Sequence, residues 1–163
     1  MNRTMASLLF AGLSVQVLIV TPSAAETHLF NARPVTEDVV AHPIAGTAVI
    51  NAFHGEAGAR RVAGAMLDRS LADPRISDIF KGHDLVRLRQ QLGDHMCWIL
   101  GGPCAYSGKS MLEAHHQMGI QEANLTALIE NLQAAMDAEH VPSWAQNKLL
   151  AKLAPFKRAV VER

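Results

Sequence analysis

The sequence predicts an all-α protein, and three observations lead to this fold class. Of its 163 residues, 49% are hydrophobic but only 5% are aromatic, so the interior must be built mainly from aliphatic side chains that suit helices. The apolar residues recur at steps of three and four, as they do along one face of a helix. No stretch alternates between apolar and polar residues for long enough to require a strand.

The N-terminus has the features of a secretory signal peptide. Arg3 supplies a positive charge, an apolar run extends from Met5 to Val20, and small residues lead to an expected cleavage site after Ala25. The run is short for a membrane span, so we expect loss of residues 1–25, export to the periplasm or the extracellular space, and no stable membrane span afterwards. An uncleaved anchor is the alternative.

Residues 26–48 are predicted to form an N-terminal extension, ahead of a domain over residues 49–163. From Glu26 to about Asn51 the chain has prolines and scattered polar residues without a sustained period. We expect this stretch to drape over the domain or to stay mobile.

The first two helices of the domain are predicted from their apolar faces and their ends. One runs from Glu56 to Ala72, and Pro74 ends it because proline disfavours helix in the residue before it. The next begins at Asp84 as its N-cap and stops before the Gly-Gly-Pro turn at residues 101–103. Its apolar face comprises Leu85, Leu88, Leu92, Met96 and Ile99.

Three more helices follow. Ser110 and Glu113 form a capping box that begins a short helix, which we expect to end at Gly119. A longer helix runs from about Glu122 to Glu139, and a final one is expected to have Ser143 as its cap and a kink at Pro155. The longer helix is predicted to bury Leu125, Leu128, Ile129, Leu132 and Met136.

Charge and motifs exclude several functions. The 15 Lys and Arg residues balance 15 Asp and Glu residues, so we expect no nucleic-acid partner. The sequence has no nucleotide-binding loop and no H-E-x-x-H, C-x-x-C or C-x-x-C-H motif. The remaining candidates are His95, His115 and His116, because a histidine on an apolar helix face is either hydrogen-bonded in the core or a ligand.

Four motifs, taken in order, resemble those of the group I truncated haemoglobins. They are LADPRI at residues 71–76 with Phe80 after it, LGGP at 100–103, YSGKSM at 106–111, and the segments AH and GI at 114–115 and 119–120. The resemblance covers about residues 49–145. It implies a two-over-two helical sandwich that holds haem b and binds a diatomic gas: O₂, CO or NO.

The resemblance assigns the haem iron to His115, which matches the proximal histidine of the family. His116 is the runner-up, and it points about 100° away on a helix, so both cannot face one iron. Phe80 matches the aromatic residue that packs on the haem. Met111 and Ile120 match apolar residues of the proximal side.

The distal side departs from the family pattern. Leu67 stands where many members have a tyrosine, Leu92 where a glutamine often supports it, and Leu88 at the gate position. We therefore expect a distal pocket without a hydrogen-bond donor. Such a pocket lowers the affinity for O₂ more than the affinity for CO. Gln91, where the family has a known distal histidine ligand, and Met96 complete the expected haem contacts.

His95 shares the helical face of Leu88 and Leu92 and is aimed toward the haem side. Three interpretations stay open: a core histidine bonded to the backbone, a polar group that steers ligand or water, and a reversible sixth iron ligand. In an enzyme, His95 would be the distal acid or base.

Cys97 and Cys104 flank the Gly-Gly-Pro turn. In an exported protein, a disulfide across this turn is one expectation. The other is that Cys97 packs in the core while Cys104 is exposed.

The leading functional hypothesis is an exported, monomeric or weakly oligomeric haem protein that binds a diatomic gas. One alternative is a haem-dependent NO dioxygenase or peroxidase, which would need an external reductase because no flavin or NAD module is visible. Another is a haem-free helical interaction module, since a fold alone does not fix function.

Overall fold

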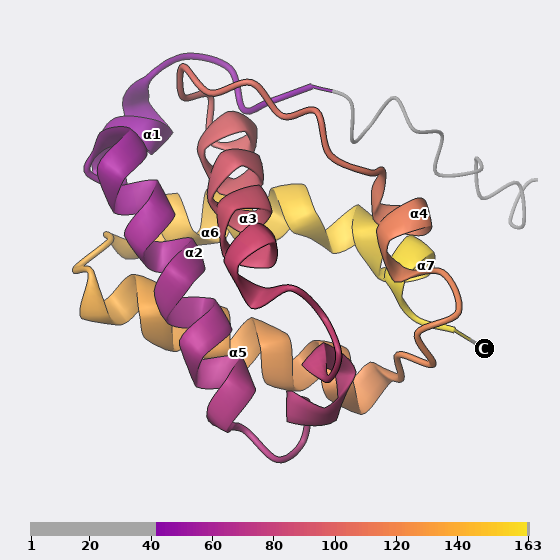
Figure 1. The fold of residues 1–163 in the computed structure, drawn as a ribbon. Helices are drawn as coiled ribbons and strands as arrows, with labels where there is room; N and C mark the ends of the chain where they lie inside the picture. The colour runs from indigo at the N-terminus through magenta and orange to yellow at the C-terminus, as the bar shows by residue number, and fades with distance from the viewer. Residues whose placement is uncertain (1–41, 163) are drawn as a thin grey trace, which may run out of the picture. The chain divides into compact units, whose positions relative to one another are not determined.

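A computed structural model describes residues 42–162, and within this range all regular structure is helical (Figure 1). The predicted fold class is confirmed. The predicted signal peptide and most of the predicted extension lie outside the described residues. The elements are α1 (Ala48–Ala52), α2 (Gly55–Ala72), η3 (Ser77–Phe80), α3 (Leu85–Ile99), α4 (Met111–His115), α5 (Glu122–Ala138), α6 (Ser143–Leu153), η4 (Ala154–Phe156) and α7 (Lys157–Val160).

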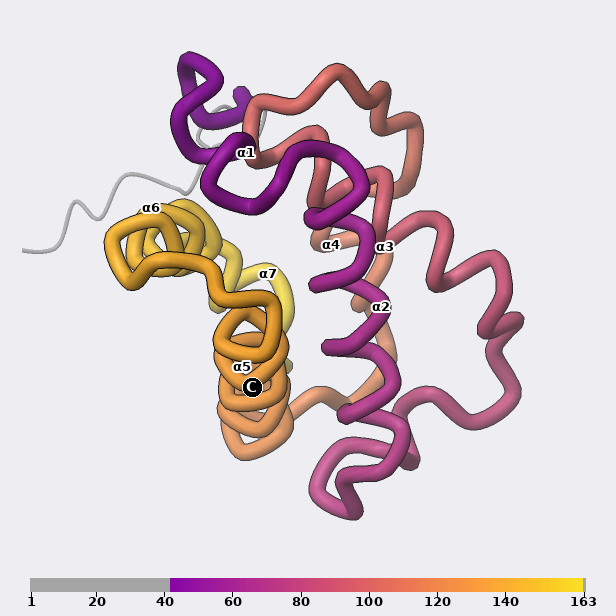
Figure 2. The backbone as a smooth tube through the Cα atoms, turned by 90° about the vertical axis from the view of Figure 1, so that its left-hand side faces the viewer, coloured from indigo at the N-terminus to yellow at the C-terminus, as the bar shows by residue number. Residues whose placement is uncertain are grey.

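Helix α2 lies at the centre of the packing, with α3 on one side and α5 on the other (Figure 2). The buried core draws on most of the helices, and burying each large apolar side chain contributes about 1.5–3 kcal/mol to the free energy of unfolding. Its fully buried members include Val62, Leu67, Ile99, Met136 and Leu149.

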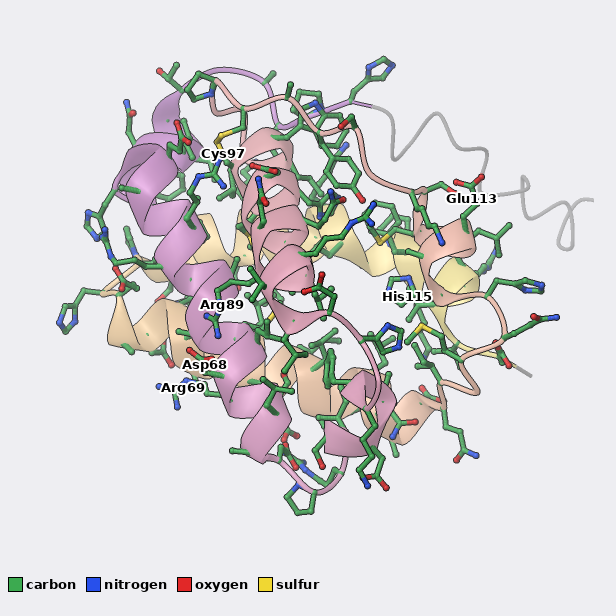
Figure 3. The ribbon with its side chains drawn as sticks, in the orientation of Figure 1. Asp68, Arg69, Arg89, Cys97, Glu113 and His115 are labelled. Atoms are coloured by element: carbon green, nitrogen blue, oxygen red, sulfur yellow. A yellow bond between two sulfur atoms is a disulfide. The ribbon has the colours of Figure 1, made fainter. Side chains whose placement is uncertain are left out.

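Two arginines cross the contact between α2 and α3. Arg60 of α2 passes over Gly93 and pairs with Asp94 of α3 at 2.7 Å. In the reverse direction, Arg89 of α3 passes over Gly64 and pairs with Asp68 of α2 (Figure 3). A glycine on each helix thus leaves room for the arginine of the other.

Helix α1 was not predicted. Its residues Val49 and Ile50 are buried in the core, so the chain is packed from this point rather than draped or mobile. A helix of five residues is too short for its apolar spacing to show a period in the sequence.

The ends of the predicted helices are partly confirmed. Asp84 accepts hydrogen bonds from the backbone of α3, and the capping box of Ser110 and Glu113 is present at α4. Helix α4 ends at His115 rather than at Gly119, because Gln117 already has a positive φ of 62°.

Two further predictions about helix ends and faces are corrected. Pro142, and not Ser143, occupies the N-cap of α6, and Ser143 is its first helical residue. Ile129, predicted to be buried, is 39% exposed on the outer side of α5. At Pro155 the α-helix gives way to the 3₁₀ turn η4, which separates α6 from α7.

Candidate functional site

A cavity of about 650 Å³ opens between α3, α4 and the elements around them. This volume lies within the usual range of sites for small molecules and cofactors. Nearly all the expected haem contacts line it: Leu67, Phe80, Leu88, Gln91, Leu92, His95, Met111, His115 and Ile120. Met96 is not among the lining residues, and its side chain packs in the core.

His115 is the last residue of α4, and it lies on the side of that helix that faces α3 (Figure 3). Its Nδ1 lies 2.7 Å from the backbone oxygen of Met111. A carbonyl oxygen can only accept, so Nδ1 carries the proton and donates it. The lone pair of the imidazole is therefore on Nε2, which is the tautomer that a histidine needs to bind a metal.

His116, the alternative ligand, does not line the cavity. It follows the end of α4, where the backbone turns to an extended conformation, and its side chain is exposed. The sequence could place these two histidines on different faces, but it could not show which face meets the cavity.

His95 faces the cavity from α3. Its ring packs edge-on against Tyr106, with ring centroids 4.8 Å apart, and lies farther from Trp98 and Phe156. Burial lowers the pKa of His95 to about 4, with a smaller contribution from repulsion by His115 in its protonated form, so the ring is neutral at pH 7.

The interpretation of His95 as a core histidine bonded to the backbone is wrong. Among the described residues none forms a hydrogen bond with its ring nitrogens, and no buried nitrogen there lacks a partner, so these atoms are open to the cavity. Leu67 of α2 and Leu88 and Leu92 of α3 carry no hydrogen-bond donor, but Gln91 and His95 of α3, which line the same cavity, do.

Three basic residues at the mouth of the cavity were missed by the sequence reasoning. His83, Arg87 and Lys109 are exposed and line it. Arg87 is on α3, whereas His83 and Lys109 lie in connections, and exposed basic residues in either place usually mark solvated surface. A signal was present for Arg87, which precedes Gln91 by one helical turn and so shares its face.

These residues fit a haem. A haem has broad apolar faces, an iron that takes an imidazole ligand, and two carboxylates at one edge. The cavity offers apolar walls, the free Nε2 of His115, and cations at its mouth where carboxylates would meet water.

A family model described as bacterial-like globin matches residues 49–162. A group 1 truncated haemoglobin from Tetrahymena pyriformis is 37% identical over 82 residues, which are 50% of this chain and 68% of that protein. The chain belongs to the bacterial-like globins, as a group 1 truncated haemoglobin. A second such haemoglobin, from Tetrahymena thermophila, is 34% identical over 88 residues, 54% of this chain and 73% of that protein.

Solved structures of truncated haemoglobins have the same fold. The Fe(III) form of the Tetrahymena pyriformis protein aligns with a TM-score of 0.67 at 28% identity, over 71% of this chain and 98% of that one. The haemoglobin of Chloroflexus aurantiacus aligns with a TM-score of 0.61 at 25% identity, with the same coverage. Membership in this family implies that this truncated haemoglobin has a haem cofactor and binds a diatomic gas.

Among the described helices of this truncated haemoglobin, none is long and apolar enough to cross a membrane.

Proposed function

We propose that this truncated haemoglobin is an exported protein that holds haem b through Nε2 of His115 and binds a diatomic gas on the α3 side of the cavity. The observation that carries the proposal is the hydrogen bond from Nδ1 of His115 to the backbone oxygen of Met111. It fixes both the tautomer and the direction of the ring.

When bound, the haem would supply the iron that takes the diatomic gas. The residues of the chain set how well that gas is held. Leu67 of α2 and Leu88 and Leu92 of α3 give this side of the cavity an apolar lining, while the neutral ring of His95 adds an imidazole to it. The basic residues at the mouth would pair with the carboxylates of the haem.

Export is supported by the disulfide that joins Cys97 to Cys104, since such bonds persist in oxidising compartments. The proposed signal peptide, residues 1–25, is tested by mass spectrometry of the protein recovered from outside the cytoplasm. Cleavage predicts an N-terminus at Glu26. Recovery of the intact chain in the cytoplasm would contradict export.

Ligation by His115 is tested with the variant His115→Gly. We expect this variant to lose the Soret band of the wild-type protein and to regain it when imidazole is added, because free imidazole replaces the missing ring. His116→Gly is the matched control and should keep its spectrum unchanged. A His115→Gly protein with the wild-type ferric and ferrous-CO spectra would refute the assignment.

A further inference from the structure

The connection between α3 and α4, residues 100–110, is itself a wall of the cavity. We call it the strap. Tyr106, Ser107, Gly108 and Lys109 of the strap all line the cavity. Tyr106 packs on the ring of His95, and its hydroxyl donates to the backbone oxygen of Lys109 at 2.8 Å. The strap therefore contacts α3 beside His95 and connects it to α4, which carries His115.

The position of His115 depends on this strap. Helix α4 has five residues, and none of them is buried. It is held by its capping box and by contact with α7. A helix this short is not stable by itself, so the segment that leads into it decides where it lies.

The strap is fixed near its start by the disulfide. Cys97 is fully buried in α3, whereas Cys104 is half-buried on the strap, and their Cα atoms are 5.8 Å apart. The backbone nitrogen of Gly102 also donates to the backbone oxygen of Cys97 at 2.9 Å. This disulfide ties the strap to a part of α3 that is itself part of the core.

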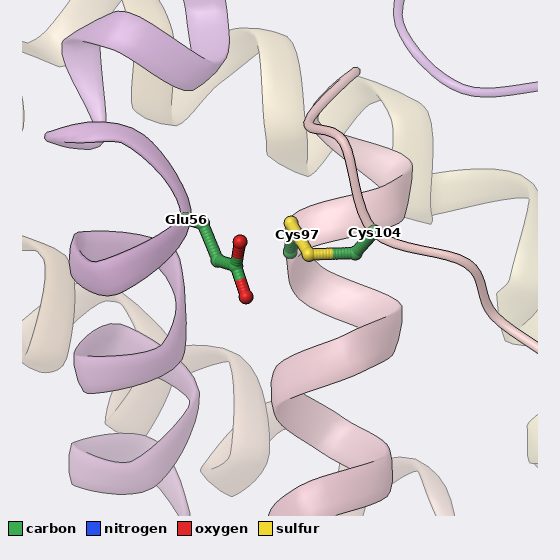
Figure 4. A group of neighbouring side chains, drawn as sticks. All are labelled: Glu56, Cys97 and Cys104. Atoms are coloured by element: carbon green, nitrogen blue, oxygen red, sulfur yellow. A yellow bond between two sulfur atoms is a disulfide. The ribbon is translucent and has the colours of Figure 1, made fainter.

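The surroundings of the disulfide favour exchange with thiols. Nη2 of Arg60 lies 3.8 Å from Sγ of Cys104, and ion pairs with Glu56 and Asp94 hold it there. Glu56 points toward the disulfide, and its carboxylate lies within 4.8 Å of both sulfur atoms (Figure 4). Cys104 is the half-exposed sulfur that an attacking thiol can reach, and the guanidinium of Arg60, although paired with two carboxylates, is a cation in contact with it.

We propose that the Cys97–Cys104 disulfide is a thiol-exchange site, with a dithiol as its substrate, and that its reduction releases the strap from α3. A thiolate of the dithiol attacks Sγ of Cys104, the bond between the two sulfurs breaks, and Cys97 leaves as a thiolate that takes a proton from water through Glu56. The second thiol of the dithiol, which loses its proton to water, then attacks the mixed disulfide. This step releases Cys104 as a thiolate beside Arg60 and leaves the dithiol oxidised.

Release of the strap loosens the wall that carries Tyr106 and the connection to His115. The reduced protein therefore opens the cavity more often than the oxidised one, and it exchanges its haem faster. The consequence for haem rests on the proposed function, whereas the exchange chemistry and the opening of the strap do not.

The test compares the full chain before and after treatment with dithiothreitol. Alkylation followed by mass spectrometry should show two new thiols without denaturant. Amide hydrogen exchange in residues 104–110 should become at least about tenfold faster, while the centre of α2 stays protected. Transfer of haem to apomyoglobin should also accelerate about tenfold, because a short disulfide loop of this kind restrains local opening to that extent.

Two arginine variants test the exchange site. Arg60→Gln should shift the equilibrium with dithiothreitol toward the disulfide by about fivefold, because the Cys104 thiolate loses its cation. Arg89→Gln is the matched control, since it also removes an ion pair between α2 and α3 but contacts no sulfur. We expect it to leave the equilibrium unchanged.

The double variant Cys97→Ser/Cys104→Ser should show the fast hydrogen exchange and haem transfer of the reduced protein, and dithiothreitol should not change either rate. If it does not fold, the reduced wild-type chain still gives the answer. A disulfide that resists dithiothreitol in the native protein, or a strap whose amides stay equally protected after reduction, would overturn the proposal. Alkylation and hydrogen exchange can be run on the haem-free chain, so a failure to bind haem would count against the proposed function alone.

Discussion

The two walls that carry His95 and His115 are built in different ways. Helix α3 is 15 residues long, and its inner side is locked against α2 by buried side chains and by Arg60 and Arg89. Helix α4 is five residues long and buries none of them. The position of His95 is thus set by the core, whereas that of His115 is set by local hydrogen bonds and by the strap.

This difference places His115, the proposed iron ligand, on the less stable side of the site. Regions with few buried contacts open at a lower free energy than the core. We therefore expect changes on α3 to alter the stability of the whole domain, and changes on α4 to alter mainly how the site holds its haem.

Truncating an apolar side chain should give the largest contrast. Ile99 of α3 is fully buried, so Ile99→Ala should lower the free energy of unfolding by about 3 kcal/mol through lost burial and a residual cavity. Leu112 of α4 is 60% exposed, and Leu112→Ala should change the free energy of unfolding by less than about 0.5 kcal/mol. Urea unfolding measures both, and equal losses would remove the distinction between the walls.

Acid should weaken the α3 wall through His95. The pKa of His95 is about 4 in the folded haem-free protein, against 6.5 for an ordinary histidine, so the unfolded chain binds the extra proton first as the pH falls. The contribution of the neutral ring to the free energy of unfolding is fully present above pH 6.5 and is lost as the pH falls from 6.5 to 4. Between pH 7 and pH 5 the loss is about 2 kcal/mol.

The measurement is urea unfolding of the haem-free protein at pH 7 and pH 5. His95→Phe keeps a ring against Tyr106 but cannot titrate, so it should lose less stability over this interval than the wild type. His116→Asn, a change at an exposed histidine, should lose as much as the wild type. An identical pH dependence in His95→Phe and the wild type would show that His95 is not the group responsible.

Removing a helix cap should reveal the same difference between α3 and α4, with a smaller effect on stability. Asp84→Ala deletes the cap of α3 and should lower the free energy of unfolding by about 1 kcal/mol. Ser110→Ala deletes the cap of α4 and should leave global unfolding nearly unchanged while speeding haem loss, because α4 frays alone. Hydrogen exchange and haem transfer to apomyoglobin distinguish the two variants. A Ser110→Ala protein with a clearly lower free energy of global unfolding would show that α4 does not open independently of the rest of the domain.

The smallest effects are expected at the mouth. Arg87→Gln on α3 and Lys109→Gln on the strap should each raise the rate of haem loss about two- to fivefold, since exposed ion pairs with the haem carboxylates are weak. High salt should erase both effects. Lys148→Gln, an exposed change on α6, is the control. A rate unchanged by both mouth variants would place the carboxylates elsewhere.

Long helices with strong end signals were predictable over nearly their whole length, whereas of the short helices only the start of α4 was. The ends of α2, α3 and α5 follow from Pro74, Asp84 and the apolar period, all of which act within a few residues. Helix α1 was not predicted because packing places its few residues. The early end of α4 was not predicted because it depends on the backbone conformation near Gln117.

The candidate site shows the same division. His115 was predicted as the iron ligand because motifs around it carry a family resemblance, and it lines the cavity together with eight of the other nine expected haem contacts. Met96 was misplaced because one helical face covers both the cavity and the core, and spacing alone does not separate them. The basic residues at the mouth were missed because an exposed charge looks the same in sequence whether or not a cavity opens beside it.

The sequence by itself determined the helical class, the capping box of Ser110 and Glu113 and the family of this globin, because these depend on residue order over short distances. The tertiary structure decided which nitrogen of His115 is free, that His95 faces the cavity without a hydrogen bond, and that the disulfide ties the strap to the core. These features join residues far apart in the chain or depend on the direction of a single ring. Their energies come from contacts that exist only once the helices have packed.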